Sequence, residues 1–524
     1  MKKNNEQNQF YNLNYEFSNK KVISIISIIF LSSLIIRFFY FDPNIPLTVD
    51  SLNYFFYAMD IRISQEIPIN YSLANNGWPL FVSMFFSSFQ FDDISNYMQL
   101  QKILSIIISS LTVIPVYFLC RKFFNPVFSL LGAFIIGFEP HLIQNSLFGI
   151  SDSLYIFLVA STLAIFLNSK NKISYLSFGL VAISTIVRSE GIFLFFTLSL
   201  MYFIIHRKNK HELLKYFIPL SIFILILSPV MIYQNSIHGD DQMFGRAANS
   251  LVTHTIDPND SGHVSGIPFI LQGFENFPKY LGWNMLPIWI FFVPLGIIII
   301  LRRICVKTGL LISSIIIMSL PAFYAYSIPL QDGRYFFFLY PAFSVIALFS
   351  ISKFIGYFPI KKEFVGITLI VGGIIFLSVF YLNNAIDNEH EKESFFIAKI
   401  LVTDEKTVNS YMPESRYLEV AGINFNYAEF QKEFLSDRIP GKSIRHSIQH
   451  NVTSIHINNF NSIESLNNLK IENNLSHLVI DISKNENGLL NQIYHNENKF
   501  PMLNKIFDSN DYQMSYKIKI FEIK

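Results

Sequence analysis

Long apolar runs alternate with short polar segments along most of this chain. Each run is close to the 20 or so residues that an α-helix needs to cross the hydrocarbon core of a bilayer, although some are slightly shorter. The pattern predicts a polytopic α-helical membrane protein with about eleven transmembrane helices. The runs lie at 22–40, 97–119, 126–140, 152–168, 173–187, 191–205, 216–234, 284–301, 309–328, 335–352 and 363–382.

One further apolar stretch, Trp78 to Phe89, is too short to span and follows Gly77. We interpret it as an interfacial helix on the outer surface, because a twelfth span here would invert everything downstream. The first run follows Lys20 and Lys21 and lacks a small-residue cleavage site. This favours an uncleaved anchor over a signal peptide.

The basic residues indicate which connections face the cytoplasm. Before position 384 most of them gather in alternate connections, for example at 20–21, 121–122, 207–215, 302–307 and 361–362. Cytoplasmic connections are enriched in Lys and Arg, so residues 1–21 are predicted to form a cytoplasmic tail. An odd number of spans then places the C-terminal part of the chain outside.

The same pattern divides the chain into domains. Residues 22–384 are predicted to form the transmembrane domain, with two large exterior loops at 41–96 and 235–283. Residues 385–524 are rich in Asn, Lys and Glu, and contain alternating runs at Ser476–Ile482 and Met514–Ile523. Such alternation is typical of half-buried strands. We therefore expect a small exterior α/β domain at the C-terminus.

Composition narrows the class of protein further. Hydrophobic residues make up 51% of the chain and charged residues only 15%, which excludes an ordinary soluble protein. The net charge of +2 is spread by position along the chain and forms no basic face for nucleic acid. Two cysteines, Cys120 and Cys305, supply neither a disulfide framework nor a metal site. No Gly-rich phosphate loop is present on the cytoplasmic side, which disfavours an ATP-driven transporter or a nucleotide-sugar enzyme.

Three acids near the predicted exterior face are candidates for chemistry. Asp50 precedes an aromatic, amphipathic run that ends at Asp60. A carboxylate there could reach both a lipid phosphate at the interface and an acceptor in water, although helix capping is the alternative role. Asp152 and Glu139 are possible second acids. Capping for Asp152, and contact with interfacial water for Glu139, are the structural alternatives.

The exterior cations are candidates for binding an anion. Arg188 and Arg334 lie at predicted exterior turns, where a basic residue runs against the charge rule. Each could pair with a nearby acid or hold a lipid phosphate, because the guanidinium offers paired donors. Arg246 and Lys279, in the second exterior loop, could contact a donor or an acceptor. The histidines at 238, 254 and 263 match no regular ligand spacing, so no metal site is predicted, although a divalent metal is compatible with the chain.

Four of these places occur in an order that resembles a known family. They are the first exterior loop with Asp50, the small residues leading into Asp152, the tip 186–191 around Arg188, and the Gly333-Arg334-Tyr335 start of a later span. The chain resembles the polytopic glycosyltransferases of the GT-C fold, above all the branch with protein O-mannosyltransferases and lipid A aminoarabinose transferases. The resemblance covers roughly residues 20–352.

This resemblance implies an activity. The donor would be a sugar on a polyprenyl (dolichyl) phosphate, and the acceptor an exterior protein, lipid or glycan. Asp50 would act as general base in an inverting displacement, while Arg188 and Arg334 would hold the donor phosphate. Family members commonly carry two adjacent acids in the first loop, but here Ser51 follows Asp50. The Trp-Trp-Asp signature of the oligosaccharyltransferase branch is absent.

Two other classes remain open on the sequence. A non-catalytic surface protein could retain the transferase scaffold, and the missing second acid is compatible with that. A secondary transporter would place ionisable residues near the bilayer midplane, with a repeat between its halves. The predicted spans are nearly free of charge in their interiors, which argues against the transporter.

Overall fold

The computed structural model describes the chain in two compact units. The first comprises Met1–Phe41, Ser72–Phe81 and Lys102–Ala385, and the second comprises Asp42–Tyr71, Val82–Gln101 and Ile386–Lys524. The residues described are 18–47, 49–68, 73, 75–91, 93–168, 171–238, 267–302, 304–328, 332–357, 359, 363–401, 406–409, 452–455, 462–473, 475–482 and 488–524.

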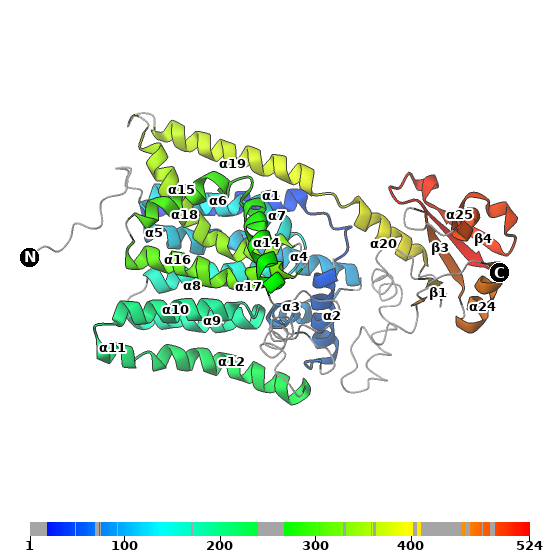
Figure 1. The fold of residues 1–524 in the computed structure, drawn as a ribbon, viewed down its shortest axis with the longest axis horizontal. Helices are drawn as coiled ribbons and strands as arrows, with labels where there is room; N and C mark the ends of the chain where they lie inside the picture. The colour runs from blue at the N-terminus through cyan, green and yellow to red at the C-terminus, as the bar shows by residue number, and fades with distance from the viewer. Residues whose placement is uncertain are drawn as a thin grey trace, which may run out of the picture. The chain divides into compact units, whose positions relative to one another are not determined.

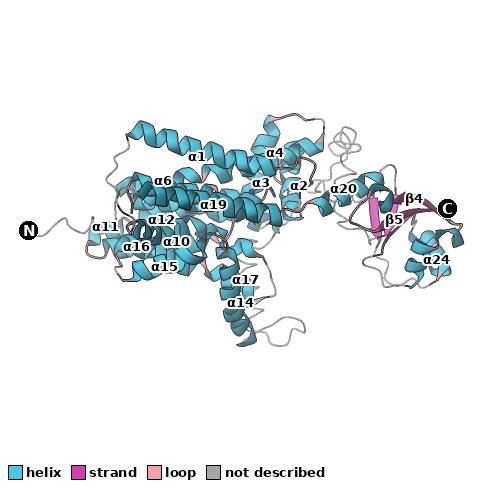
Figure 2. Ribbon diagram, turned by 90° about the horizontal axis from the view of Figure 1, so that it is seen from above, coloured by secondary structure: helices cyan, strands magenta, loops and turns pink. Residues whose placement is uncertain are grey.

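The first unit is a helical bundle (Figure 1), in which α9 (Leu176–Val187), α10 (Gly191–His206) and α12 (Phe217–His238) lie side by side. Two of its helices, α14 (Ile267–Met285) and α17 (Leu320–Ser327), pair with each other and project from the bundle (Figure 2). Two helices run through both units: α3 (Gly77–Ser88) and α4 (Ile94–Leu111). The other helices of the first unit are α1 (Asn19–Tyr40), α5 (Val113–Arg121), α6 (Pro126–Gly137), α7 (Pro140–Ser146), α8 (Asp152–Asn168), η1 (Asn171–Tyr175), α9 (Leu176–Val187), α10 (Gly191–His206), α11 (Lys210–Leu214), α12 (Phe217–His238), α14 (Ile267–Met285), α15 (Trp289–Leu301), α16 (Val306–Met318), α17 (Leu320–Ser327), η2 (Gly333–Leu339), α18 (Tyr340–Ile355) and α19 (Glu363–Ala385).

The apolar runs of the sequence coincide with these helices. Among the described residues, six helical segments are long and apolar enough to cross a membrane, or up to eight when two bent helix pairs each count as one span. The runs predicted at 152–168, 173–187 and 191–205 correspond to three shorter apolar helices. The prediction of a polytopic helical protein is confirmed, whereas the number of crossings stays a prediction.

Local chemistry explains where several helices begin. Ser18 caps α1 and accepts a hydrogen bond from the backbone N–H of Lys21. Asn125 caps α6 in the same way, with Pro126 at the first helical position. Glu139 caps α7, which begins at Pro140. A side-chain acceptor followed by proline is a strong start signal, because proline lacks the N–H that would otherwise need a partner.

The helices of the bundle differ in how much of their surface is buried, which distinguishes a central helix from the outer ones. In the segment Gly333–Ile355, 94% of the residues of the apolar stretch are buried inside the protein. The buried share is 22% for Phe364–Ala385 and 17% for Lys210–Ser236. Helix α18 packs against α15 and α6. The outer helices expose large apolar side chains such as Leu225, Ile232 and Phe376, which suits a surface surrounded by lipid.

The second unit includes parts of the first predicted exterior loop. Helix α2 (Val49–Ser64) buries Phe55, whose ring lies 5.7 Å from that of Phe86. Arg62 covers the ring of Tyr97 at 4.5 Å. This unit also contains α20 (Glu389–Leu401), where Lys392 forms a 2.6 Å ion pair with Asp42. Burial alone would raise the pKa of Asp42, but its bonds to Lys392 and Asn44 hold that pKa below its usual range.

The C-terminal part of this unit carries a five-stranded mixed sheet of order β2-β1-β3-β5-β4. Strands β1, β2 and β3 run parallel, while β5 is antiparallel to both β3 and β4. The two predicted strands correspond to β3 and β5, so the small α/β domain is confirmed. The elements are β1 (Lys406–Asn409), β2 (Val452–Ile455), α24 (Ile463–Asn473), β3 (His477–Asp481), α25 (Gly488–His495), η4 (Glu497–Lys499), β4 (Leu503–Asp508), η5 (Ser509–Tyr512) and β5 (Ile518–Ile523).

Candidate functional site

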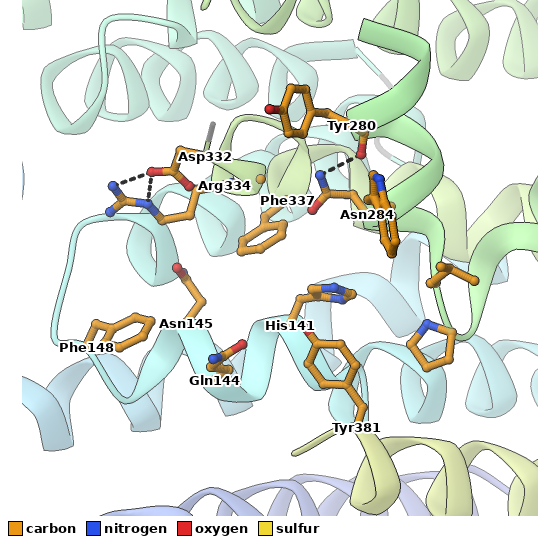
Figure 3. Close-up of a pocket in the computed structure, with 14 residues that line it drawn as sticks. His141, Gln144, Asn145, Phe148, Tyr280, Asn284, Asp332, Arg334, Phe337 and Tyr381 are labelled. Atoms are coloured by element: carbon orange, nitrogen blue, oxygen red, sulfur yellow. Dashed lines mark hydrogen bonds and ion pairs between the residues drawn. The ribbon is translucent and has the colours of Figure 1, made fainter. Parts of the chain in front are cut away.

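A pocket of about 750 Å³ opens within the helical bundle (Figure 3). Its walls combine aromatic rings with amide side chains, one imidazole and one ion pair. Small-molecule sites usually have this character, with a few polar groups set in a largely apolar wall. The lining residues are His141, Gln144, Asn145, Phe148, Tyr280, Trp283, Asn284, Leu286, Pro287, Asp332, Gly333, Arg334, Phe337 and Tyr381.

The pocket forms where three breaks in the helices meet. Helices α6 and α7 are bent by 48° at their junction, and α14 and α15 by 111°. The third break is the 3₁₀ segment η2, which leads into α18. Regular transmembrane helices satisfy their own backbone groups, so irregular backbone at this depth is tolerated where protein or a cavity surrounds it. The breaks therefore supply both the space and the polar groups of the site.

Gly333 permits the closest of these approaches. A Cβ at this position would lie 2.6 Å from Oδ1 of Asn284, which is shorter than real Cβ contacts. The amide of Asn284 is itself held on α14, where it donates to the carbonyl of Tyr280 at 2.8 Å. The absence of a side chain at Gly333 thus lets the segment bearing Arg334 lie against α14.

Arg334 lies at the pocket in a fixed orientation. Its Nε and Nη2 both contact Oδ2 of Asp332 at 2.6 Å, and its backbone N–H donates to Oδ1 of the same residue at 3.0 Å. The two side chains are 31% and 32% exposed. Asp332 therefore aims the guanidinium while leaving it accessible to a ligand.

Arg188 lies in a more enclosed place, at the tip between α9 and α10. Its guanidinium bonds to Asp152 at 2.5 Å and to Glu190 at 2.8 Å. Burial by itself raises the pKa of Glu190, but the charge and hydrogen bond of Arg188 outweigh it and keep that pKa below its usual range. The pairing with a nearby acid that the sequence left open for Arg188 is thus present, with two acids, Asp152 and Glu190.

The tip is braced by the start of α3 and by Asn75 just before it. Oδ1 of Asn75 accepts from the backbone N–H of Ser189 at 3.1 Å, and the indole of Trp78 donates to the carbonyl of Gly149 at 3.0 Å. Gly77 touches the backbone of Val187 so closely that a Cβ would lie 2.7 Å from its nitrogen. The stretch expected at the interface is therefore packed in part against the tip.

The two arginines lie close to the same aromatic residue, Tyr335. The guanidinium of Arg188 lies 5.9 Å from the ring centre of Tyr335 and 5.9 Å from that of Tyr155. Tyr335 directly follows Arg334, and Asp152 is within electrostatic range of both arginines. The fold thus brings together Arg188, Arg334 and Asp152, which are far apart in the sequence.

The other candidate residues have different settings. Asp50 is exposed, as the second residue of α2, and belongs to the second unit. Glu139 is fully buried, with one oxygen capping α7 and the other bonded to His141. Lys279 is exposed on α14, 5.9 Å from the ring centre of the pocket residue Tyr280. Arg246 lies outside the described residues.

The described residues hold no group of three or more potential metal ligands. Of the three loop histidines, His254 and His263 lie outside the described part of the chain, and His238 ends α12.

Reasoning from the sequence missed most of the pocket wall. His141, Asn145 and Asn284 sit inside or beside apolar runs, where they resemble ordinary polar positions of a bundle. The available signal was proline, since Pro140 and Pro287 interrupt apolar runs at the two bends that form the pocket. Proline breaks or begins helices, and such breaks often carry binding residues in membrane proteins.

Comparisons with solved structures identify the fold. The crystal structure of ArnT from Cupriavidus metallidurans bound to undecaprenyl phosphate matches with a TM-score of 0.58 and 11% identity, over 97% of this chain and 98% of that chain. The Archaeoglobus fulgidus oligosaccharyltransferase in complex with Zn and sulfate matches with a TM-score of 0.54 and 12% identity, over 88% of this chain and 68% of that one. The chain is therefore a polytopic membrane protein with the GT-C fold of such glycosyltransferases.

A family model matches part of the chain, and a further solved structure matches most of it. Residues 91–233 match the family described as dolichyl-phosphate-mannose-protein mannosyltransferase. The archaeal oligosaccharyltransferase AglB from Archaeoglobus fulgidus, in complex with an inhibitory peptide and a dolichol-phosphate, matches with a TM-score of 0.50 and 11% identity, over 88% of this chain and 69% of that chain. A comparison with curated protein sequences finds no match.

Proposed function

We propose that this protein is a membrane glycosyltransferase that takes a sugar from a polyprenyl (dolichyl) phosphate. The observation that carries the proposal is the pocket at the three helix breaks, with Arg334 aimed along its wall by Asp332. The match of residues 91–233 to a dolichyl-phosphate-mannose-dependent family supports the same donor class. The bound lipid phosphates in ArnT and AglB are further support.

In this proposal the arginines bind the donor phosphate. Arginine is suited to phosphate because its planar fork supplies paired, charge-assisted donors. Arg334, about one-third exposed at the pocket, makes the direct contact. Arg188 lies beside Tyr335 and also pairs with Asp152 and Glu190, so it would contact the phosphate by exchanging one of these carboxylates for it. Both charges would stabilise the phosphate as it leaves the sugar.

Asp50 is the proposed general base. It would take the proton of an acceptor hydroxyl while the oxygen attacks the anomeric carbon from the face opposite the phosphate. The bond to phosphate breaks as the new glycosidic bond forms, so a single displacement inverts the anomeric configuration. Exposure of Asp50 on α2 is compatible with reaching an acceptor in water. The acceptor would be an exterior protein, lipid or glycan.

An assay of donor consumption tests the proposal. The native protein in detergent is incubated with dolichyl phosphate carrying radiolabelled mannose or glucose, and release of sugar from the lipid is measured. We expect release by the native protein and by Arg302→Ala, an exposed arginine at the end of α15 away from the pocket. Release by Arg334→Ala should fall at least tenfold.

Two outcomes would contradict the proposal. If the native protein neither binds nor consumes any donor lipid, the fold serves a non-catalytic role. If Arg334→Ala and Arg302→Ala lose activity equally, the pocket is not the donor site.

A further inference from the structure

Helix α7 presents a polar face to the pocket that the proposed chemistry does not use. His141, Gln144 and Asn145 are spaced three and four residues apart, so they share one side of the helix. Gln144 turns its amide to the carbonyl of Ala385 at 3.2 Å. Figure 3 shows His141 near Asn284, Phe337 and Tyr381, with Asn145 on the same wall.

Glu139 fixes the hydrogen-bonding character of His141. Its Oε1 contacts Nδ1 of the imidazole at 2.9 Å, and its Oε2 accepts from the backbone N–H of Leu142 at 2.8 Å. The buried Arg37 is close enough to attract this carboxylate electrostatically. A carboxylate in its ionised form only accepts hydrogen bonds, so opposite that form Nδ1 is the donor of this contact. In the neutral ring Nε2 is then an acceptor, and it is the nitrogen left for the pocket.

Asn145 supplies a second acceptor on this wall. Its Oδ1 is buried and has no hydrogen-bond partner among the described residues. A buried polar atom without a partner is costly in a finished structure, so it points to a group that arrives with a ligand. Asn145 and His141 stand one helical turn apart on α7, so one ligand in the pocket can contact both.

The opposite polarity is found at Arg334. A phosphate diester has only acceptor oxygens, so it binds to the guanidinium. It cannot form hydrogen bonds with the two acceptor atoms on α7. Hydroxyl groups can donate to both acceptors. The pocket therefore offers the guanidinium of Arg334, paired with Asp332, on the segment that leads into α18, and two further acceptors on α7.

We propose that His141 and Asn145 bind hydroxyl groups of the donor sugar and so determine which sugar the pocket accepts, with Glu139 as the positioning residue for His141. This rests on the proposed function and assigns the sugar end of the donor to α7. The rings of Phe337 and Tyr381, 5.7 and 4.7 Å from that of His141, limit the orientations that the imidazole can adopt.

The experiment compares two lipids that differ only in the sugar. Binding of dolichyl phosphate mannose, dolichyl phosphate glucose and bare dolichyl phosphate to the native protein is measured in detergent. The sugar preference is the affinity for the tighter sugar lipid divided by that for bare dolichyl phosphate. His141→Asn keeps a donor for Glu139 but lacks the outer ring nitrogen, so the variant should fold.

We expect His141→Asn and Asn145→Ala each to reduce the sugar preference by about 3- to 10-fold, the usual effect of one lost hydrogen bond, with bare lipid bound as in the native protein. Glu139→Gln should reduce the preference similarly, because an amide can donate to Nδ1 and leave Nε2 protonated. Arg334→Ala should weaken the binding of all three lipids by the same factor. His206→Asn, at the end of α10, is the matched control and should change nothing.

The inference would be overturned if the α7 variants weakened the binding of bare and sugar-bearing lipids equally. It would also be overturned if they weakened the binding of neither lipid. Failure of the native protein to bind bare dolichyl phosphate would instead count against the proposed function itself.

Discussion

Arg188 and Arg334 both sit at turns before apolar helices, yet they are held in different ways. The side chain of Arg188 is 14% exposed and pairs with two carboxylates that are 4% and 14% exposed, whereas that of Arg334 is 31% exposed and pairs with one carboxylate that is 32% exposed. Removing one partner of a buried pair leaves an uncompensated charge, while an exposed pair contributes little to stability. Mutation of Arg188 should therefore mainly reduce stability, whereas mutation of Arg334 should mainly reduce donor binding.

Arg188→Ala should destabilise the protein by roughly 3–5 kcal/mol, because Asp152 and Glu190 would remain buried without their cation. Arg334→Ala should change stability by only about 0–1 kcal/mol but should weaken donor binding roughly 10- to 150-fold, the effect of a lost charge-assisted bond. Thermal unfolding and donor affinity measured on both variants test this. Equal losses of stability would show that the Arg188 cluster is not the buried network described here.

Asp50→Asn tests the proposed base. The change preserves size and most hydrogen bonding, so folding and donor binding should stay near native. Turnover should fall by about 10²- to 10⁴-fold, the usual loss for a missing general base. The control is Asp42→Asn, an acid of the same loop whose partner is Lys392. If Asp50→Asn keeps its turnover, Asp50 is a helix-terminal acid and the mechanism fails.

At the scale of helices, the bracing of the Arg188 tip makes a stringent test. Gly77→Ala would place a methyl group 2.7 Å from the backbone nitrogen of Val187, and backbone cannot move aside as a flexible side chain can. We expect a loss of about 1–3 kcal/mol, typical of overpacking, together with weaker donor binding as the tip shifts. Thermal unfolding and donor affinity are the measurements.

Gly372→Ala is the matched control, because a Cβ there meets nothing within 4 Å. Alanine has the higher helix propensity, so this variant should be neutral or slightly stabilised. A Gly77→Ala protein that unfolds and binds like Gly372→Ala would mean that α3 does not brace the tip.

The helices themselves were predictable, but the pocket was not. Apolar runs such as 22–40 and 363–382 are long enough to identify their helices without tertiary information. The pocket forms only when the bend at Pro140, the bend before Trp289 and the segment of Gly333 lie close together. Long stretches of chain separate these three places. These three places come together through packing between helices. The hydrophobic pattern of a single run contains no information about which other helices it contacts.

Individual partners were predictable where they are close in sequence. Asp332 with Arg334, and Glu190 with Arg188, follow from spacings of two residues. Glu139 was recognised as an acid beside Pro140, but its bond to His141 turns it toward the protein interior. His141 lies just after the predicted apolar run 126–140, so only the bend at Pro140 indicates that it reaches a cavity.

At the scale of the whole molecule, the orientation in the membrane can be tested directly. The charge pattern predicts that residues 385–524 face the exterior. A reporter that is active only when exported, fused after Lys524, should be active. The same reporter inserted after Lys208, between α10 and α11, should be silent. The reverse pattern would place Asp50 and the pocket on the cytoplasmic side and would remove the reason for a lipid-linked donor.

The lengths of two helices, α8 and α10, have a consequence for the surrounding lipid. Helices α8 and α10 have 17 and 16 residues, whereas α1 and α19 have 22 and 23. At about 1.5 Å per residue the shorter pair reach about 24–26 Å, less than the roughly 30 Å of a typical hydrocarbon core. A bilayer adapts to short helices by thinning beside them. Thinning next to α8, α9 and α10 would draw the lipid headgroups inward toward the tip that carries Arg188, so that a polyprenyl phosphate could meet the protein without leaving its own leaflet.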